Sequence, residues 1–472
     1  MRLSVCIPTH NGRCRLLEEA LESIASQAMH NLPMEAEIVV SDNASSDGTE
    51  EMVAGFASRH PKLQIVYGRN ERDVRLENIE RAVARARGDW CWLFGSDDLM
   101  ADDGLKTVME VIRRFPNASG VGVAKANFSH DMSAQLESDI PEFYPDHSEL
   151  THLTGFAETL GETAFLHAFM GTNIVRRDRF LDAADRKGRE AIRRHPTWPH
   201  LIILADMLRH HPSWVWLPYV LIKARAGRPY LVEQDGTSPN LARMHSLLAR
   251  SLRDAWAEIA GSDVRLFTTL IRKSYAVVGS PSVVRNLKAA DGQTLGRDIE
   301  LLASFTRAFW TLPEFRRTCF PLLLVPGALW RARSLRRQRR AQMPRLDPGE
   351  ICTVVHSSAP STATPRTSMV VRSILTNRGS RALQWANPFP VALGYRWFDA
   401  VSGIAVKSDD RTILPRPVAS GESLELYSRV NVPWEPGIYD LRISPVQEHV
   451  VWFDDLDASY GASARIRVSP PF

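Results

Sequence analysis

Short apolar runs alternate with apolar positions at helical spacing along the first hundred residues. The runs predict strands over residues 3–8, 37–41, 62–67 and 90–94. Between them, apolar side chains recur at the period of a helix in residues 16–28, 52–56 and 76–87. Strands and helices that alternate in this way predict an α/β domain with a mostly parallel sheet flanked by helices.

This pattern changes twice beyond residue 225. Residues 240–340 predict helices rich in Leu, Ala and Arg, whereas from Gly349 onward short alternating runs separated by turn residues predict an all-β sandwich. A chain of 472 residues is too long for one hydrophobic core, so several domains are expected. We expect a catalytic α/β domain over residues 1–225, a helical region over residues 226–345 and an accessory β-sandwich over residues 349–472.

Polar residues follow three of the four predicted strands. They are Thr9-His10-Asn11 after the first strand, Asp42-Asn43 after the second and Asp97-Asp98 after the fourth. Open parallel sheets bind ligands at the carboxyl ends of their strands, so these side chains are expected at one edge. A turn explains any one of these clusters equally well, but their coincidence favours a ligand site.

Asp97 and Asp98 end the most apolar strand of the chain. Carboxylates are hard oxygen ligands, and Mg²⁺ or Mn²⁺ typically takes one or two of them together with phosphate oxygens. The pair predicts a Mn²⁺ or Mg²⁺ site that holds a diphosphate. The alternative is that Ser96 and Asp97 cap the following helix.

Three stretches of the chain resemble family 2 glycosyltransferases of the GT-A fold. They read SVCIPTHNG over residues 4–12, VVSDNASSDGT over residues 39–49, and ARGDW over residues 86–90 leading to Ser96-Asp97-Asp98. The resemblance is close over about residues 1–125 and looser as far as residue 225. It implies an inverting, metal-dependent transfer of a sugar from a nucleoside-diphosphate sugar to an acceptor hydroxyl, in the synthesis of a bacterial surface polysaccharide or glycan. The acceptor would be a glycan or a lipid-linked oligosaccharide.

The resemblance also implies roles for single residues. Thr9 and His10 match a segment whose aromatic ring lies against the base, and Asp42 and Asn43 match positions that bind the base and ribose. Arg75 falls near a position that contacts the diphosphate, although a solvated charge on a helix explains it as well. The expected donor-binding residues are Pro8, Thr9, His10, Asn11, Asp42, Asn43, Arg75, Ser96 and Asp97.

The chain departs from the family at the metal motif. The family commonly reads Asp-x-Asp-Asp, and Gly95 occupies the first of these positions here. The resemblance therefore implies a metal site made of Asp97, Asp98 and the phosphates of the donor itself.

The general base is harder to assign, because the chain lacks the Glu-Asp pair that the family usually carries about a hundred residues after the metal motif. A helix is predicted there with Thr197 as its N-cap and His200 in its first turn. A histidine is a competent base, so His200 is the expected general base. Together with the metal-binding Asp98, it makes up the expected catalytic residues. A structural histidine is the alternative, and the competing bases are Asp206, Glu162 and Asp139.

A small-residue turn that feeds a strand precedes this helix. In related enzymes the segment borders the acceptor and the donor sugar, so Gly171, Thr172 and Asn173 are expected sugar contacts. An ordinary turn is the equal alternative.

An uncharged apolar run over residues 320–330 is followed by six arginines between residues 331 and 340. The run is too short to span a bilayer. An apolar segment beside a basic one predicts peripheral attachment to an anionic membrane, and a helix packed on the catalytic domain is the alternative. Nucleic acid is disfavoured, because the net charge is only +4 and no nucleic-acid-reading module accompanies the arginines.

The remaining composition bears on location. Five cysteines form no pair motif, and the chain starts directly in a strand without a signal peptide or transmembrane span. We expect a cytoplasmic protein that attaches peripherally to the inner face of the membrane. In the sandwich, Trp385, Trp397, Trp434 and Trp452 form either a sugar-stacking face or, more simply, core and rim.

Two other classes of function remain open at this level. A nucleotidyltransferase that makes the activated sugar also uses a parallel sheet and a metal, but it would want a Gly-rich basic loop after the first strand, and Asn11-Gly12-Arg13 is a poor version of one. The third class is a non-catalytic scaffold whose sandwich binds carbohydrate.

Overall fold

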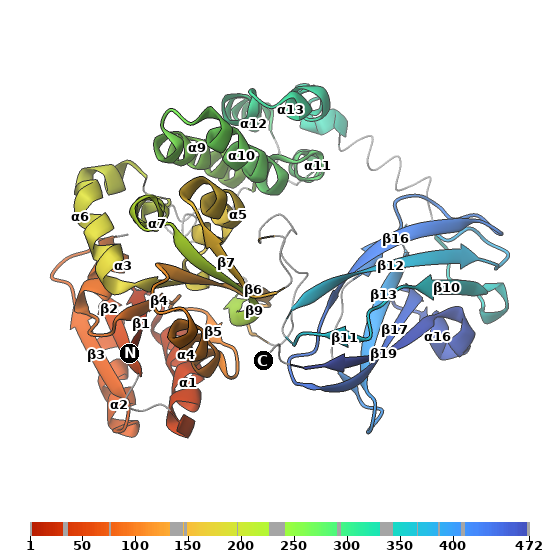
Figure 1. Cartoon of the computed structure of the whole chain (residues 1–472). Coiled ribbons are helices and arrows are strands. Elements are labelled where there is room, and N and C mark those ends of the chain that lie inside the picture. Colours follow the sequence, from red (N-terminus) through yellow and green to blue (C-terminus); the bar gives the residue numbers. More distant parts are fainter. Residues whose placement is uncertain are drawn as a thin grey trace. The chain divides into compact units, whose positions relative to one another are not determined.

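The computed structural model describes most of the chain in two compact units, with a boundary between Trp330 and Arg331 (Figure 1). The described residues are 2–31, 36–74, 77–132, 145, 149–195, 197–225, 241–289, 294–330, 343–365, 367–385, 388–406 and 411–469. Arg75, Asp139 and the six arginines of residues 331–340 lie outside them. Each unit is described by itself.

Within the described residues, the first unit is built on a nine-stranded sheet in the order β3-β2-β1-β4-β8-β6-β9-β5, with β7 paired to β9. The strands are β1 (Leu3–Thr9), β2 (Ala36–Asp42), β3 (Gln64–Arg69), β4 (Trp90–Leu93), β5 (Leu99–Met100), β6 (Gly120–Phe128), β7 (Thr151–Thr154), β8 (Asn173–Arg176) and β9 (Ser213–Arg225). The first four strands pair in parallel as expected. Beyond them the sheet is mixed, because β8 runs antiparallel to both β4 and β6.

Helices cover both faces of this sheet, which explains why the central strands β1, β2 and β4 are buried along nearly their whole length. They are α1 (Cys14–Asn31), α2 (Thr49–Arg59), α3 (Glu77–Arg85), α4 (Gly104–Arg114), α5 (Phe156–Ala168), α6 (Arg177–Arg194) and α7 (Pro199–His210). Successive residues of β1 point to opposite faces: Val5 packs in the cluster with α1, α2 and α4, and Cys6 packs in the cluster with α3, α5, α6 and α7. The expected α/β domain is confirmed; only the third strand is displaced, starting at Gln64 rather than Lys62.

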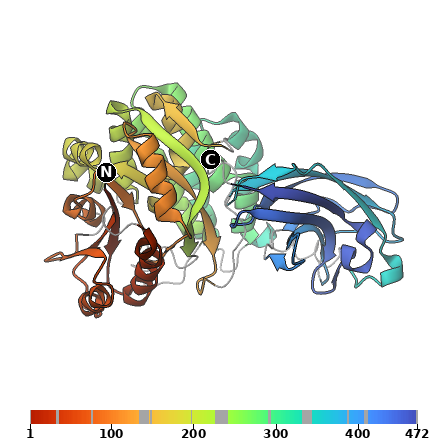
Figure 2. The ribbon, with the colours of Figure 1, turned by 60° about the horizontal axis from the view of Figure 1, so that its bottom comes forward.

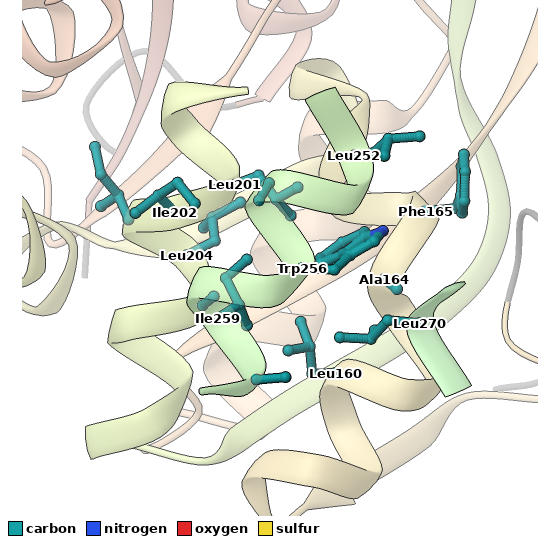
Figure 3. Packing of buried hydrophobic residues seen from close by; sticks show 14 of the residues in the cluster. Leu160, Ala164, Phe165, Leu201, Ile202, Leu204, Leu252, Trp256, Ile259 and Leu270 are labelled. Atoms are coloured by element: carbon teal, nitrogen blue, oxygen red, sulfur yellow. The ribbon is translucent and has the colours of Figure 1, made fainter. Parts of the chain in front are cut away.

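A helical region extends the second of these clusters. Its helices are α9 (Leu241–Ala260), α10 (Val264–Ser274), α11 (Pro281–Ala289), α12 (Leu295–Phe309), α13 (Pro313–Thr318) and α14 (Phe320–Leu324). Trp256 of α9 is fully buried against α5 and α7, among Leu160, Leu201 and Leu204 (Figure 3). The helical region and the sheet therefore share one hydrophobic core. Across the part of the chain that the structure describes, no helix is both long and apolar enough to cross a bilayer.

The second unit consists mainly of β-strands, with a short helix, α16 (Phe453–Leu456) (Figure 2). Its strands form a three-stranded sheet, β10 (Thr353–Ser357), β12 (Ser368–Asn377) and β16 (Ser423–Asn431), and a larger sheet of β11 (Thr362–Ala363), β13 (Val391–Asp399), β14 (Ala405–Val406), β15 (Arg411–Ile413), β17 (Gly437–Gln447), β18 (Val451–Trp452) and β19 (Ala462–Val468). Buried and exposed residues alternate along β16, and Val371 and Leu426 share one core cluster with Leu393 and Leu441 of the larger sheet. This confirms the expected all-β C-terminal region.

The four tryptophans of this unit do not share one environment. Trp397 is buried in the core, where its indole N–H donates to the Asn431 carbonyl oxygen at 2.8 Å. The ring of Trp452 lies between two guanidinium groups, 4.3 Å from that of Arg396 and 4.7 Å from that of Arg411. Trp385 is exposed. The core position of Trp397 removes it from any sugar-stacking face.

Candidate functional site

The carboxyl ends of β1, β2 and β4 lie at one edge of the sheet. Thr9 is the register partner of Asp42, and the amide of Asn43 donates to the Thr9 carbonyl oxygen at 3.0 Å. The amide of Phe94, just after β4, donates to the Cys6 carbonyl oxygen at 2.9 Å. The three polar clusters that follow these strands are thereby brought to a single edge.

Asn78, on the buried face of α3, fixes the spacing of the first two strand ends. Its amide nitrogen donates to the carbonyl oxygens of Thr9 at 3.1 Å and Ser41 at 2.8 Å, and its amide oxygen accepts from the Ser41 hydroxyl at 2.7 Å. The sequence analysis missed this residue. Its signal is a single amide on a helix stripe that otherwise carries Ile79, Ala82 and Val83, where a buried polar group must be hydrogen-bonded.

Asp42 is buried and already hydrogen-bonded within the protein. The Tyr67 hydroxyl donates to its Oδ2 at 2.6 Å, and the Ser45 amide donates to its Oδ1 at 3.1 Å. Burial and this carboxylate raise the pKa of Tyr67 well above its usual range. Asn43 bridges to the neighbouring loop, since its amide oxygen accepts from the Val74 amide at 2.8 Å and its amide nitrogen donates to Asp73. Both residues thus hold the β2 end rigid.

The loop after β1 carries the other expected donor contacts. Pro8 and Thr9 are the last two residues of β1, just before this loop. The buried Thr9 hydroxyl has no hydrogen-bond partner among the described residues. His10 is half-buried, with its Nδ1 2.8 Å from the Asn11 carbonyl oxygen. The Asn11 side-chain oxygen accepts from the Ser46 amide at 2.7 Å. An orphaned buried hydroxyl at a ligand edge fits a polar partner supplied by a ligand.

Asp98 is buried next to the half-exposed Asp97. Its Oδ1 accepts from the Arg225 amide at 3.0 Å, and the Arg225 guanidinium donates to the Asp97 carbonyl oxygen at 2.8 Å. Burial, and then the charge of Asp97, raise the pKa of Asp98 to about 7. The Arg225 side chain is itself buried and forms an ion pair with Glu19 of α1. The sequence analysis missed this residue, because a single arginine at the end of an apolar strand is usually interpreted as a solvent-exposed charge.

The two carboxylates suit a divalent cation in chemistry and charge, because a buried like-charged pair is relieved by a cation. They do not form a complete protein cage: no group of three His, Cys, Asp or Glu side chains that could hold a metal occurs among the described residues. A side chain at Gly95 would place its Cβ 2.5 Å from the Asp98 Oδ2. The acid that the family carries at this position would therefore require the Asp98 carboxylate to move. Ser96, which lies between Gly95 and Asp97 in the sequence, is buried.

The turn before β8 brings a third segment to the carboxylates. Residues Met170–Thr172 form one 3-10 turn, and a Cβ on Gly171 would lie 3.7 Å from the Asp98 Oδ2. The Trp92 indole N–H donates to the Gly171 carbonyl oxygen at 2.8 Å, which ties this turn to β4. Gly171 therefore borders the candidate metal site.

The other two residues of this prediction point into the protein. The Thr172 hydroxyl donates to the carbonyl oxygens of Leu166 and Phe169, each at 2.7 Å. The Asn173 amide nitrogen donates to the Phe169 carbonyl oxygen at 2.7 Å, and its amide oxygen lies 2.8 Å from the His167 Nδ1. Both side chains are fully buried, so they shape the turn; their contact with sugar stays a prediction.

His200 lies in the first turn of α7 but is buried. Its Nε2 donates to the Ala168 carbonyl oxygen at 3.2 Å, and burial lowers its pKa to about 4. The expected cap was wrong: Trp198 is the N-cap, because its carbonyl oxygen accepts the Leu201 amide, while the Thr197 hydroxyl donates to Ser251. The imidazole is neutral at pH 7, and its role as base stays a prediction.

The competing bases are engaged elsewhere. Asp206 pairs with the Arg186 guanidinium at 2.9 Å, and Glu162 lies 3.9 Å from the Lys273 ammonium. Neither of these ion pairs includes Asp97 or Asp98. The base therefore remains the least defined part of the site.

Comparisons with known proteins agree with this geometry. Residues 4–180 match the model of the family described as Glycosyl transferase family 2. The abequosyltransferase RfbV of Salmonella typhimurium is 46% identical over 106 residues, which is 22% of this chain and 31% of that protein. The GalNAc(5)-diNAcBac-PP-undecaprenol beta-1,3-glucosyltransferase of Campylobacter jejuni is 31% identical over 109 residues, which is 23% of this chain and 34% of that protein.

The chain thus spans about a third of the length of these relatives. A crystal structure of Staphylococcus aureus TarS aligns over 99% of this chain and 78% of that one, with 13% identity and a TM-score of 0.45. The family match covers the strand ends at which the polar clusters converge, and over residues 4–180 the chain is similar to glycosyl transferase family 2.

Proposed function

We propose that this chain transfers a sugar from a nucleoside-diphosphate sugar to an acceptor hydroxyl of a surface glycan, with inversion at the anomeric carbon. The observation that carries the proposal is the convergence of three strand ends on the buried Asp98 and its half-exposed neighbour Asp97, within the residues that match the family 2 model. One relative is named as an abequosyltransferase, and another as a GalNAc(5)-diNAcBac-PP-undecaprenol beta-1,3-glucosyltransferase. A lipid-linked oligosaccharide is accordingly the acceptor that we propose.

Each part of the edge has a role in this proposal. Thr9, His10 and Asn43 line the base and ribose, with the orphaned Thr9 hydroxyl as a polar contact. Asp97 and Asp98 would hold Mn²⁺ or Mg²⁺, which when bound neutralises charge on the departing diphosphate. The Arg225 amide holds the Asp98 carboxylate, and its buried guanidinium holds the backbone of Asp97 through the carbonyl oxygen.

Thermal unfolding in the presence of nucleotide-sugars tests this proposal. We expect sugars of one nucleoside diphosphate to raise the melting temperature in the presence of Mn²⁺, since a ligand at about 100 times its Kd stabilises the native state by about 2.7 kcal/mol. Transfer to a lipid-linked acceptor is then measured with that donor. Stabilisation by nucleoside triphosphates alone, with release of pyrophosphate, would instead establish a nucleotidyltransferase.

The end of the helical region supports a proposal of peripheral membrane attachment. The Lys288 ammonium donates to the carbonyl oxygens of Leu323 at 2.9 Å and Val325 at 3.0 Å, and Asp298 accepts the Gly327 amide at 2.7 Å. These bonds fix a segment that leaves Leu324 57% and Leu329 63% exposed. The sequence places six arginines directly after it. Exposed leucines beside a basic run suit an anionic lipid surface.

Co-sedimentation with vesicles measures this attachment. We expect the wild-type chain to bind phosphatidylglycerol vesicles more tightly than phosphatidylcholine vesicles. A Leu324→Glu/Leu329→Glu variant should bind at least about tenfold more weakly, because each buried leucine contributes about 1.5–3 kcal/mol. Val401→Glu, at a still more exposed site in the second unit, should bind like the wild type. Equal binding by all three chains would exclude this segment as the attachment site.

A further inference from the structure

Arg13 lies against the candidate metal site. It is the last residue of the loop between β1 and α1, and its guanidinium forms an ion pair with the Asp97 carboxylate. The Arg13 side chain is 11% exposed and that of Asp97 is 32% exposed, so the pair is largely shielded from water. Shielding strengthens an ion pair relative to one on the open surface.

The loop that carries Arg13 is fixed from both sides. The Gly12 amide donates to the Asp47 carboxylate at 2.7 Å, and the Arg13 carbonyl oxygen accepts the Leu17 amide at 2.8 Å as the first bond of α1. Gly12 adopts φ +83°, a conformation that glycine accommodates readily. The backbone of Arg13 is therefore fixed, while its long side chain can change partner by rotation.

Three cations surround the two carboxylates, and they differ in their commitments. Arg225 is bonded to the Asp97 carbonyl oxygen, to Glu19 and to the His130 carbonyl oxygen. Lys125 donates to Asn127 at 2.7 Å, and its charge acts on Asp98. Arg13 forms an ion pair with a carboxylate oxygen of Asp97 that the proposed metal would take.

We propose that Arg13 binds the diphosphate of the donor and, until donor and metal arrive, neutralises Asp97. This inference rests on the proposed function. A guanidinium binds phosphate oxygens with two parallel hydrogen bonds, so a diphosphate next to Asp97 is a suitable alternative partner. When a cation takes Asp97, the charge of Arg13 is released toward the phosphates that the same cation contacts.

The exchange couples the two ligands. A metal that arrives alone must displace Arg13 from Asp97 and leave that guanidinium without its carboxylate. A metal that arrives with the diphosphate gives Arg13 a new anionic partner. Coupling of this kind is reciprocal, so the donor raises the affinity for the metal by the factor by which the metal raises the affinity for the donor.

Metal and nucleotide binding by the full chain test the inference without any measurement of turnover. Mn²⁺ binding is followed by electron paramagnetic resonance in the absence of nucleotide. UDP, GDP, CDP and dTDP binding is followed by calorimetry at saturating Mn²⁺. We expect Arg13→Gln to bind Mn²⁺ alone at least about tenfold more tightly than the wild type, and to bind its nucleoside diphosphate at least about tenfold more weakly.

Two further variants separate charge, geometry and folding. Arg13→Lys keeps the charge but loses the forked donor, so Mn²⁺ affinity should stay near that of the wild type while nucleotide affinity falls. Arg59→Gln removes a cation that pairs with Glu18 on α1, and it should leave both affinities unchanged. Thermal unfolding of each variant shows that the fold is intact.

The outcomes distinguish this inference from the proposed function. If the wild type binds Mn²⁺ and a nucleoside diphosphate and Arg13→Gln leaves both affinities unchanged, Arg13 has no such role and the proposed function stands. If the wild type binds neither Mn²⁺ nor any of the four nucleotides, both are wrong. Tighter Mn²⁺ binding with unchanged nucleotide affinity overturns the diphosphate contact.

Discussion

Asp98→Asn is expected to lower the transfer rate at least about 1000-fold, because loss of a ligand to a divalent cation at the leaving diphosphate removes several kcal/mol of transition-state stabilisation and each 1.36 kcal/mol is tenfold in rate. Asn keeps the size of the side chain, and its amide oxygen can still accept the Arg225 amide that Asp98 accepts at 3.0 Å. The loss is measured as transfer from the donor identified by thermal stabilisation. A variant that turns over like the wild type would exclude Asp98 from the reaction.

The same variant should fold at least as stably as the wild type above neutral pH. Burial raises the pKa of Asp98 to about 7, so the folded state holds a proton that the unfolded state has already released at lower pH. Stability contributed by this group therefore falls as pH rises from the ordinary carboxyl range to about 7. Asn carries no such dependence. Melting temperatures at pH 5 and pH 8 should diverge less for Asp98→Asn than for the wild type, and the exposed Asp102→Asn should behave as the wild type does.

Lys288→Met should destabilise the first unit by about 3–5 kcal/mol, because it leaves Asp298 buried without its ammonium partner. The ammonium lies 2.9 Å from the Asp298 carboxylate, and the two side chains are 1% and 9% exposed. The variant also loses the bonds from Lys288 to two carbonyl oxygens of the 320–330 segment. Urea unfolding of the full chain, followed by tryptophan fluorescence, measures the change, since Trp256 lies in the core that α9, α11 and α12 share.

Two companion variants isolate the buried charge. Lys288→Met with Asp298→Asn should recover most of the lost stability, because the amide carries no charge and still offers an oxygen to the Gly327 amide. Arg307→Met breaks an exposed pair with Asp254, and it should cost at most about 1 kcal/mol. Equal losses in Lys288→Met and Arg307→Met would show that burial of the Lys288 pair contributes nothing to its effect.

The fold was predictable where the apolar pattern carries it. The β1, β2 and β4 boundaries agree within a residue or two, because strands covered on both faces are continuous apolar runs. The place of β8 was not predictable. Residues 173–176 are inserted antiparallel between β4 and β6, and pairing between segments about eighty residues apart leaves no periodic trace in either one.

The site was predictable at the strand ends and obscure elsewhere. Sequence position alone brought Thr9, Asp42 and Asp98 to one edge, since parallel strands share their carboxyl ends. Asn78 and Arg225 were missed because each acts through hydrogen bonds to backbone atoms of distant residues. His200 shows what spacing alone leaves open: spacing correctly placed it in a first helical turn, but only packing shows that the imidazole is buried.

The antiparallel insertion of β8 has a consequence for how the site can vary. The turn at Gly171 reaches Asp98 from the opposite direction along the sheet, and it arrives on a segment separate in sequence from the strand ends of β1, β2 and β4. Under the proposed function, the Met170–Thr172 turn borders the sugar, and its residues can change without altering the strand ends of β1, β2 and β4. Variation confined to this turn would then change the sugar that is transferred and leave the nucleotide site as it is.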